Sequence, residues 1–510
     1  MKKSSLLMGA IILFCCNFIS RGLGFLYKII LVRIIGSEGI GLSEMVIPVY
    51  SFALVVSSLG IPLAMTRLIS SLIGRQDFNN TRRIWDISLK LLVISGLIFS
   101  LLFYIFADKF IGFFAIDNCV LVCFKIMIPA IFIVTVCSAY RAYFQAIKQI
   151  AVIGYSQNIE QFCRVILGIF LAYYFIPFGV ETAVAAISVA TVCGELLGLL
   201  YIVHKFKVYK PQNDLKPTLS KHQIVKYLFT VGTPVTMQRL VMSLVLMLQS
   251  FMIPNLLHSS GIATDAATAL YGNFSGVAMS LINLPGIFTA TLTMAILPAV
   301  SETNHRKDIL NFRINQSLQL TTFIGIPVSF IFWLFGTQLC EWLFNTPEAG
   351  DILKVLAIGA VFIYSNTVLT GILQGMGNVK YLLFSLIFSG FVLIVCLWIL
   401  VPKLGIVGAA VSSIVFFVLN CLLNLKYIFI NCKMDMDIKN ILLKPILAVL
   451  TALTIKNAAN IIFAAYIPQN QYLSFVFDFT IIIVSYILVL IVTRGLPMLI
   501  TKNIRGRNHR

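Results

Sequence analysis

Apolar runs long enough to cross a bilayer follow one another along almost the whole chain. A transmembrane helix needs about 20 mostly apolar residues, and about fourteen such runs occur in the 510 residues. They cover approximately residues 6–32, 41–72, 87–106, 119–145, 151–175, 180–203, 226–256, 269–299, 316–340, 352–376, 380–401, 405–430, 441–467 and 472–493. With 59% hydrophobic and 11% charged residues, the chain has more apolar surface than a water-soluble protein can bury in its core. The sequence therefore predicts an all-α polytopic membrane protein with about 14 transmembrane helices.

Basic residues gather in every second loop between these runs. The basic set comprises Lys2, Lys3, Arg75, Arg82, Arg83, Lys148, Lys205, Lys207, Lys210, Lys216, Lys221, Arg306, Lys307, Arg313, Lys380, Lys426, Lys433, Lys439 and the tail from Arg494. The alternate loops hold little beyond Arg33, Lys109 and Lys403. Cytoplasmic loops are enriched in Lys and Arg, so both termini are expected in the cytoplasm and the protein in the cell membrane. The net charge of +19 is spread over these loops, which argues against a nucleic-acid partner.

The two halves of the chain resemble each other. One displacement of 229 residues relates Gly96 to Gly325 and Gln145 to Gln374. The longest basic loop, with Pro211 and Pro217, divides the halves. We expect six-helix lobes at 1–204 and 226–430, a cytoplasmic linker at 205–225, two additional helices at 431–493 and a basic tail at 494–510. Transporters built from such parallel repeats bind substrate between the halves and alternate access by rocking.

Four cations lie within or beside apolar runs. Arg21 and Lys28 are seven residues apart on one helical face of the first run. Arg67 follows Pro62, which should kink the second helix, and Arg239 lies near the expected midplane of the seventh. A buried cation costs several kcal/mol in hydrocarbon and normally faces a bundle interior. For Lys28 and Arg67, the alternative to an inward-facing position is snorkelling to the membrane surface. Together, the four cations predict a site for an anion such as a pyrophosphate.

Carboxylates are fewer within the spans. Glu160 and Arg164 are four apart in the fifth helix and can pair on one face. Glu195 lies in the sixth helix, where it serves either as an interhelical contact or as a proton site. The three residues are therefore candidates for a structural ion pair or for coupling to an H+ or Na+ gradient.

Sequence signals of catalysis are missing. The sequence contains no GxxxxGKS/T and no HExxH motif, and its 11 cysteines form no CxxC pair. The cysteines are interpreted as small apolar residues of helix interiors. We therefore expect no enzymatic activity and no bound cofactor or metal.

Several motifs together resemble the stage V sporulation protein B family. They are residues 33–42 (RIIGSEGIGL), 48–50 (PVY), 60–64 (GIPLA), 156–161 (SQNIEQ), 297–302 (LPAVSE) and 373–378 (LQGMGN). The family is part of the multidrug/oligosaccharidyl-lipid/polysaccharide exporter superfamily, which includes MATE-like exporters. The resemblance implies 14 helices in a V-shaped pair of six-helix lobes with two additional C-terminal helices.

The first helix also resembles the pattern Ser-Arg-x-Leu-Gly-Phe-x-Arg of lipid II flippases. Ser20, Arg21 and the run Leu23–Phe25 match it, while Tyr27 occupies the position of the last arginine and Lys28 follows. The resemblance implies flipping of an undecaprenyl-pyrophosphate-linked glycan, with a lipid II-type precursor for the spore cortex as the expected cargo. Peptidoglycan polymerases are the implied protein partners.

Other functions fit part of the pattern. An ion-coupled exporter of small cationic or amphipathic molecules would use Glu160 or Glu195, and a translocase of another lipid-linked polysaccharide would use the same cations. A membrane glycosyltransferase would need catalytic carboxylates or large outer loops, and the expected outer loops are short. The sequence favours the flippase.

Overall fold

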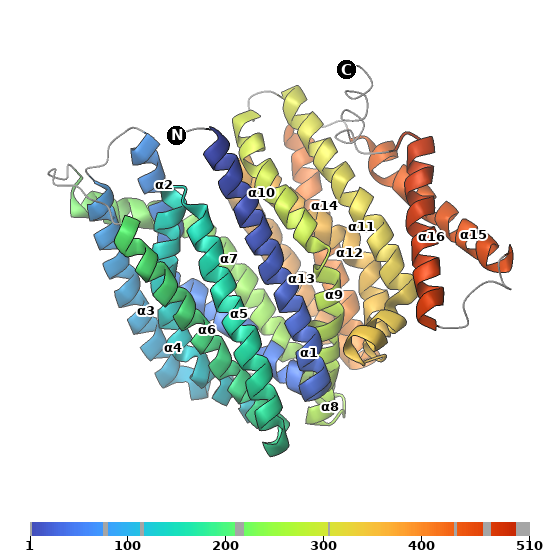
Figure 1. Ribbon diagram of the computed structural model, residues 1–510, viewed down its shortest axis with the longest axis horizontal. Helices are drawn as coiled ribbons and strands as arrows, with labels where there is room; N and C mark the ends of the chain where they lie inside the picture. The colour runs from blue at the N-terminus through green and yellow to red at the C-terminus, as the bar shows by residue number, and fades with distance from the viewer. Residues whose placement is uncertain are drawn as a thin grey trace. The chain divides into compact units, whose positions relative to one another are not determined.

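The structure is a computed structural model, which describes residues 3–74, 80–112, 117–209, 219–303, 307–432, 436–462 and 471–495. Within these ranges the chain is helical and has no strand. The centre of the predicted linker, 210–218, and the tail from 496 lie outside the described residues. In order, the helices are α1 Lys3–Ser58, α2 Ile61–Gly74, α3 Thr81–Gly112, α4 Asn118–Ala146, α5 Ile150–Phe175, η1 Ile176–Phe178, α6 Val180–Tyr209, α7 Lys221–Ser259, α8 Thr264–Tyr271, η2 Gly272–Ala278, α9 Met279–Asn283, α10 Gly286–Thr303, α11 Lys307–Phe344, α12 Ala349–Gly375, α13 Val379–Leu404, α14 Ile406–Cys432, η3 Lys439–Leu443, α15 Lys444–Ile462 and α16 Gln471–Val492 (Figure 1).

The described helices make the chain a multi-pass membrane protein. Twelve of them are long and apolar enough to cross a membrane, or thirteen when the bent pair Thr264–Asn283 and Gly286–Met294 counts as one span. A helix satisfies all its backbone hydrogen bonds internally, which hydrocarbon requires. The all-α expectation is confirmed, whereas the number of 14 stays a prediction.

The first expected span, 6–32, and the first part of the second, 41–58, both lie within α1. Gly36 interrupts this helix with φ 70° and ψ −177°, a conformation open to glycine. Across the break, Lys28 Nζ lies 2.8 Å from Glu44 Oε1. Sixteen residues of straight helix would separate these positions by about 24 Å. The chain therefore turns back at Gly36, and the two parts of α1 face each other.

A second break separates α1 from α2. Leu59 and Gly60 have φ values of 49° and 68°, and Pro62 is the second residue of α2. Proline is tolerated in the first turn, where its missing N–H has no helical partner. The interruption expected at Pro62 in the run 41–72 is therefore present, but as a complete break before Pro62 and not as a kink within one helix.

The chain divides into two compact units. One comprises Met1–Ser280, Leu343–Thr346 and Ile394–Ala409, and the other comprises Leu281–Trp342, Pro347–Leu393 and Ala410–Arg510. The first unit thus includes α7, α8 and η2, beyond the linker expected at 205–225. The six-helix repeat and the lobe boundaries stay predictions, because a division into compact units does not test whether the two halves repeat each other.

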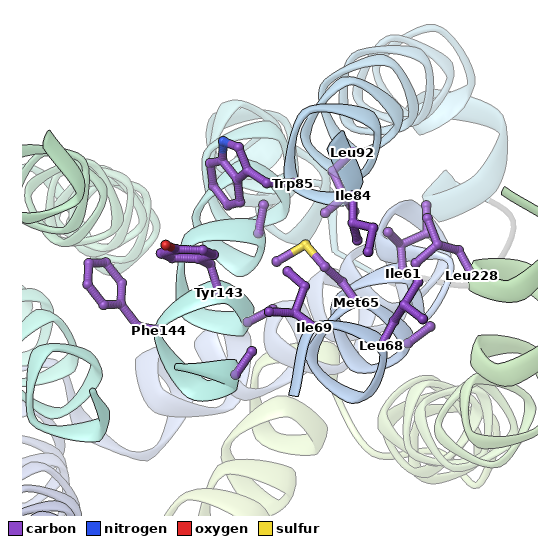
Figure 2. Packing of buried hydrophobic residues seen from close by; sticks show 14 of the residues in the cluster. Ile61, Met65, Leu68, Ile69, Ile84, Trp85, Leu92, Tyr143, Phe144 and Leu228 are labelled. Carbon is purple, nitrogen blue, oxygen red and sulfur yellow. The ribbon is translucent and has the colours of Figure 1, made fainter. Parts of the chain in front are cut away.

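An aromatic core packs one end of the first unit. Trp85 of α3 stacks on Phe206 of α6 with ring centroids 4.4 Å apart, and Tyr143 of α4 lies 5.4 Å from Trp85. Met65 and Ile69 of α2 join the same buried cluster (Figure 2). Aromatic pairs contribute beyond their burial, so this cluster holds α2, α3, α4 and α6 together.

The predicted additional helices, α15 and α16, pack on each other within the second unit. Lys456 Nζ lies 3.2 Å from Asp478 Oδ2 across the pair. Buried residues of both helices, among them Ala448 and Ile482, share a core with Ile326 and Phe335 of α11. The pair is therefore anchored to α11 by apolar packing and by the hydrogen bond from the Tyr486 hydroxyl to the Phe323 carbonyl, 2.9 Å long.

Glycine allows α1 to pack backbone to backbone against the end of α8 and the π-helical segment η2. A Cβ on Gly272 would lie 1.9 Å from the Ser37 carbonyl oxygen, and a Cβ on Gly41 would lie 2.1 Å from the Thr268 carbonyl oxygen. The Ser37 hydroxyl donates to Asn273 Oδ1 over 2.6 Å at the same contact. This approach brings η2 against the C-terminal part of α1, where Glu44 lies.

Alanine at position 272 is therefore expected to destabilise the first unit. The Cβ must push η2 away from α1, and overpacking of this kind costs about 1–3 kcal/mol. Thermal unfolding in detergent checks the effect, with Gly112→Ala as the matched control, because a Cβ at Gly112 meets no atom within 4 Å. Equal melting temperatures for the two variants would contradict the packing argument.

Candidate functional site

A polar cavity of about 430 Å³ lies inside the first unit. It is lined from α1, α4, α5 and α6. The polar residues that line it are Tyr27, Lys28, Ser43, Glu44, Tyr50, Ser51, Glu160, Gln161, Arg164, Ser188, Thr191 and Glu195. Ionisable groups are rare inside membrane spans and usually mark a functional pathway. The cavity is therefore the candidate substrate site.

Lys28 and Glu44 form the first charged group of the cavity. Lys28 Nζ also donates to the Ser280 hydroxyl over 2.8 Å, and the Ser275 hydroxyl donates to Glu44 Oε2 over 3.0 Å. Lys28 comes before the Gly36 break and Glu44 after it, so the fold-back of α1 creates the pair. The pair also ties α1 to η2, where Ser275 lies.

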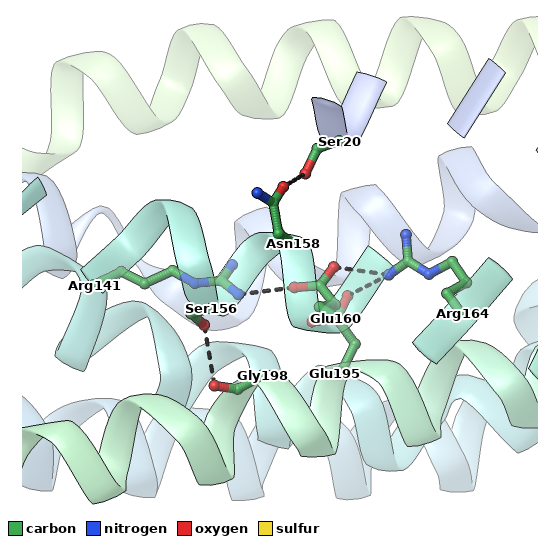
Figure 3. A network of polar contacts seen from close by, with 8 residues as sticks. All are labelled: Ser20, Arg141, Ser156, Asn158, Glu160, Arg164, Glu195 and Gly198. Atoms are coloured by element: carbon green, nitrogen blue, oxygen red, sulfur yellow. Dashed lines mark hydrogen bonds and ion pairs between the residues drawn. The ribbon is translucent and has the colours of Figure 1, made fainter. Parts of the chain in front are cut away.

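A network of two arginines and two glutamates forms the second group (Figure 3). Glu160 of α5 accepts from Arg141 of α4 through Oε2 at 2.8 Å and from Arg164 through Oε1 at 2.9 Å. Arg164 also donates to Oε1 of Glu195 on α6 at 2.9 Å. The Glu160–Arg164 pair expected from the sequence is thus present, and the network joins three helices.

Short side chains let these helices approach. A Cβ on Gly194 of α6 would lie 2.8 Å from the Glu160 carbonyl oxygen, so only glycine fits there without a shift. Nearby, the Ser156 hydroxyl donates to the Gly198 carbonyl over 3.0 Å, and the Ser20 hydroxyl donates to Asn158 Oδ1 over 2.6 Å (Figure 3). These contacts fix α5 between α1 and α6.

The structure brings four of the predicted site residues around this cavity: Lys28, Glu160, Arg164 and Glu195. Arg239 instead lines a smaller cavity of about 220 Å³ with residues of α1, α2 and α4. Arg21 and Arg67 are exposed and line neither cavity. Among the described residues, neither Arg21 nor Arg239 forms an ion pair, so both charges are available to a ligand.

Sequence reasoning missed two partners in the charged groups, Glu44 and Arg141. Each lies within an apolar run, at 41–72 and 119–145. The test that selected Arg21, a charge inside a predicted span, would have found both. Tyr50 was missed for another reason, since nothing in the sequence distinguishes its hydroxyl from those of lipid-facing tyrosines.

Profiles of two protein families match the chain. The profile of polysaccharide biosynthesis proteins matches residues 6–304, and the MatE profile matches residues 234–399. Stage V sporulation protein B of Bacillus subtilis (strain 168) is 30% identical over 435 residues, which cover 83% of each chain. The chain belongs to this family of polysaccharide biosynthesis proteins. The family resemblance inferred from the sequence motifs is therefore confirmed.

Two further comparisons bear on the fold and the relatives of this family member. Lipid II flippase MurJ of Bacillus subtilis (strain 168) is 25% identical over 412 residues, covering 76% of this chain and 75% of the relative. A solved structure of lipid II flippase MurJ in an inward closed conformation aligns with TM-score 0.73 and 16% identity over 95% of this chain and 99% of that one. The predicted MATE-like membrane fold is thereby confirmed.

Proposed function

We propose that this protein flips an undecaprenyl-pyrophosphate-linked glycan from the cytoplasmic to the outer leaflet of the cell membrane by alternating access. The observation that carries the proposal is the charged cavity inside the membrane-spanning first unit, with Arg21 next to it on α1. Arg21 comes one turn before Gly24 and two turns before Lys28, and both of these line the cavity. Such a site suits a headgroup that carries both phosphates and polar groups. Relatives that include a lipid II flippase support a lipid II-type precursor as the cargo.

Arg21 and Arg239 are the strongest candidates for binding the pyrophosphate. The planar fork of a guanidinium pairs with two phosphate oxygens at once, and no described carboxylate neutralises either arginine. Lys28 would have to leave Glu44 to join them, and Arg67 would assist from the exposed face of α2. We therefore expect the pyrophosphate to bind Arg21 and Arg239 in preference to Lys28 and Arg67.

Coupling to an H+ or Na+ gradient is assigned to the network of Glu160, Arg164 and Glu195. Arg164 bridges the two carboxylates. An anionic headgroup that competes for Arg164 would free a carboxylate to take up a cation. The same network has a structural role, because it joins α4, α5 and α6.

In the cell, both termini are placed in the cytoplasm and the cargo is proposed to serve cortex peptidoglycan of the spore. Peptidoglycan polymerases, which consume lipid-linked precursors on the outer side, are the proposed protein partners. The relation to stage V sporulation protein B supports a role in sporulation.

Reconstitution tests the flippase directly. The purified protein is placed in liposomes that carry lipid II in the inner leaflet, and the appearance of lipid II outside is measured. Net transport that requires the protein supports the proposal. Absence of transport under any H+ or Na+ gradient, together with gradient-driven efflux of a cationic dye, would replace it with the ion-coupled exporter.

A further inference from the structure

A network of uncharged side chains lies inside the second unit. The Ser385 hydroxyl of α13 donates to Asn424 Oδ1 of α14 over 3.0 Å, and Asn424 Nδ2 donates to Asn420 Oδ1 over 2.7 Å. Asn420 Nδ2 in turn donates to the Ser389 hydroxyl over 2.9 Å. These four residues, the asparagine hub, are each at most 4% exposed. Because buried polar networks with all their bonds made are rigid, the hub fixes α13 against α14.

The hub also orients Asn366 of α12. Asn424 Nδ2 donates to Asn366 Oδ1 over 3.0 Å, so the amide oxygen of Asn366 points toward the hub and its nitrogen points away. Within the described ranges no group accepts from this nitrogen. Asn366 is half-buried, and its Nδ2 is accessible. It therefore presents two oriented N–H donors on the side away from the hub.

Asn366 belongs to a polar stripe on α12. Asn366, Thr370 and Gln374, the polar stripe, follow one another at intervals of four residues, so they share one helical face, and all three are half-buried. Helical threonines commonly bond the carbonyl four residues earlier, as Thr367 does, but the Thr370 hydroxyl has no partner in the described part of the chain. Ile358, which is 64% exposed, lies about 120° around the helix from Thr370 and belongs to a different, apolar face.

The polar stripe lies deep within a membrane span. α12 is long and apolar enough to cross a membrane, and Asn366 lies nine residues before its last residue, Gly375, about 14 Å along the axis. An N–H donor that faced hydrocarbon at this depth would stay without a partner, which is strongly unfavourable. The stripe therefore faces a polar space.

The sequence displacement of 229 residues relates the hub to the ion network of the first unit. It relates Glu160 to Ser389 and Glu195 to Asn424. The two carboxylates line the charged cavity, whereas the hub residues are uncharged and bonded to one another. Hydrogen bonds between neutral groups are weaker than those to charged groups. Weak contacts suit a surface along which a polar group must move and then leave.

We propose that the polar stripe lines the path of the cargo's headgroup during flipping, and that Asn366 donates hydrogen bonds to oxygens of that headgroup. The inference rests on the proposed function and concerns the second unit, outside the charged cavity. Phosphate and hydroxyl oxygens accept from an amide, and Thr370 can donate or accept. Asn420 and Asn424 are positioning residues, because they orient the amide without touching the cargo.

Cysteine labelling tests whether the polar stripe faces a polar space. Asn366→Cys and Thr370→Cys are made in the full chain, reconstituted in liposomes and exposed to a charged, water-soluble thiol reagent. Labelling is counted above that of the wild type, which has cysteines of its own. We expect both variants to react and lipid II to protect them. Ile358→Cys, on the apolar face, should not react.

Asn366→Asp tests the donor itself, because it keeps an oxygen for Asn424 and replaces the outward amide nitrogen by a carboxylate oxygen. We expect flipping of lipid II at least about 10-fold slower than in the wild type, since a donor is lost and like charges repel. Thr370→Val keeps the shape of the side chain and should slow flipping about 3- to 10-fold, the effect of one lost hydrogen bond. Asn431→Asp, the same change at an exposed residue of α14, should leave the rate unchanged.

Three results would overturn the inference. Failure of both stripe cysteines to react would place the stripe against lipid or protein. Reaction without protection by lipid II would leave water as the occupant. Normal flipping in both Asn366→Asp and Thr370→Val would show that the cargo does not touch the stripe. If the wild-type protein flips no lipid II, the proposed function fails as well, whereas normal wild-type flipping with unreactive stripe cysteines rejects the path along α12 alone.

Discussion

Replacing Arg21 by alanine is expected to slow flipping of a pyrophosphate-linked lipid by about one to two orders of magnitude. Hydrogen bonds to charged groups contribute about 1.5–3 kcal/mol, and Arg21 has no described carboxylate to take up its charge in place of a phosphate. Because the residue is exposed on α1, truncation leaves no cavity in the core. The initial rate of lipid II appearance outside reconstituted liposomes, at matched protein density, measures the loss.

Two controls separate charge from geometry. Arg21→Lys retains the charge but loses the two-pronged contact, so an intermediate rate is expected. Lys354→Ala removes a cation that pairs with Asp351 at 3.0 Å, where the Asp351 side chain is 80% exposed, and should leave the rate unchanged. A normal flipping rate in Arg21→Ala would show that α1 does not bind the pyrophosphate. An equal loss of rate in Lys354→Ala would indicate a general effect of charge.

Helices and local pairs could be predicted from the sequence because both depend on neighbours along the chain. The apolar runs predicted both ends of α4 and α5 to within one residue, whereas the run at 87–106 is six residues shorter than α3 at each end. Glu160 and Arg164 were found because residues four apart share a helical face. Such features need no knowledge of which helices touch.

Breaks and long-range partners could not be predicted in this way. Gly22, Gly24 and Gly36 all lie in or beside the same apolar stretch, yet only Gly36 among the three leaves the helical conformation. The pairing of Lys28 with Glu44 depends on that break. The arrangement of Arg141, Glu160 and Glu195 depends on three helices meeting, which no spacing within one helix encodes.

Removing Glu160 from the Arg141–Glu160–Arg164–Glu195 network is expected to lower the stability of the protein strongly, because it upsets the balance of charge. Glu160→Ala leaves two guanidinium groups with the single carboxylate of Glu195, and their side chains are only 22% and 24% exposed. Removing one partner of a buried pair costs about 3–5 kcal/mol, because an uncompensated charge remains. We expect a loss of this order in the stability of the detergent-purified protein, measured by thermal or denaturant unfolding. Asp351→Ala, in an exposed pair, should cost less than about 1 kcal/mol.

The double variant Arg141→Met/Glu160→Gln discriminates between lost contacts and lost balance. It removes more interactions than Glu160→Gln alone, yet it leaves Arg164 paired with Glu195 and no excess charge. If the uncompensated charge dominates, the double variant will be more stable than the single one, because replacing both members of a buried pair is often nearly neutral. If the lost contacts matter more than the charge, the double variant will be less stable than Glu160→Gln alone. The network would then stabilise the protein through its contacts between α4 and α5. Stability restored in the double variant, with flipping still impaired, would give the network a role in transport beyond holding the helices together.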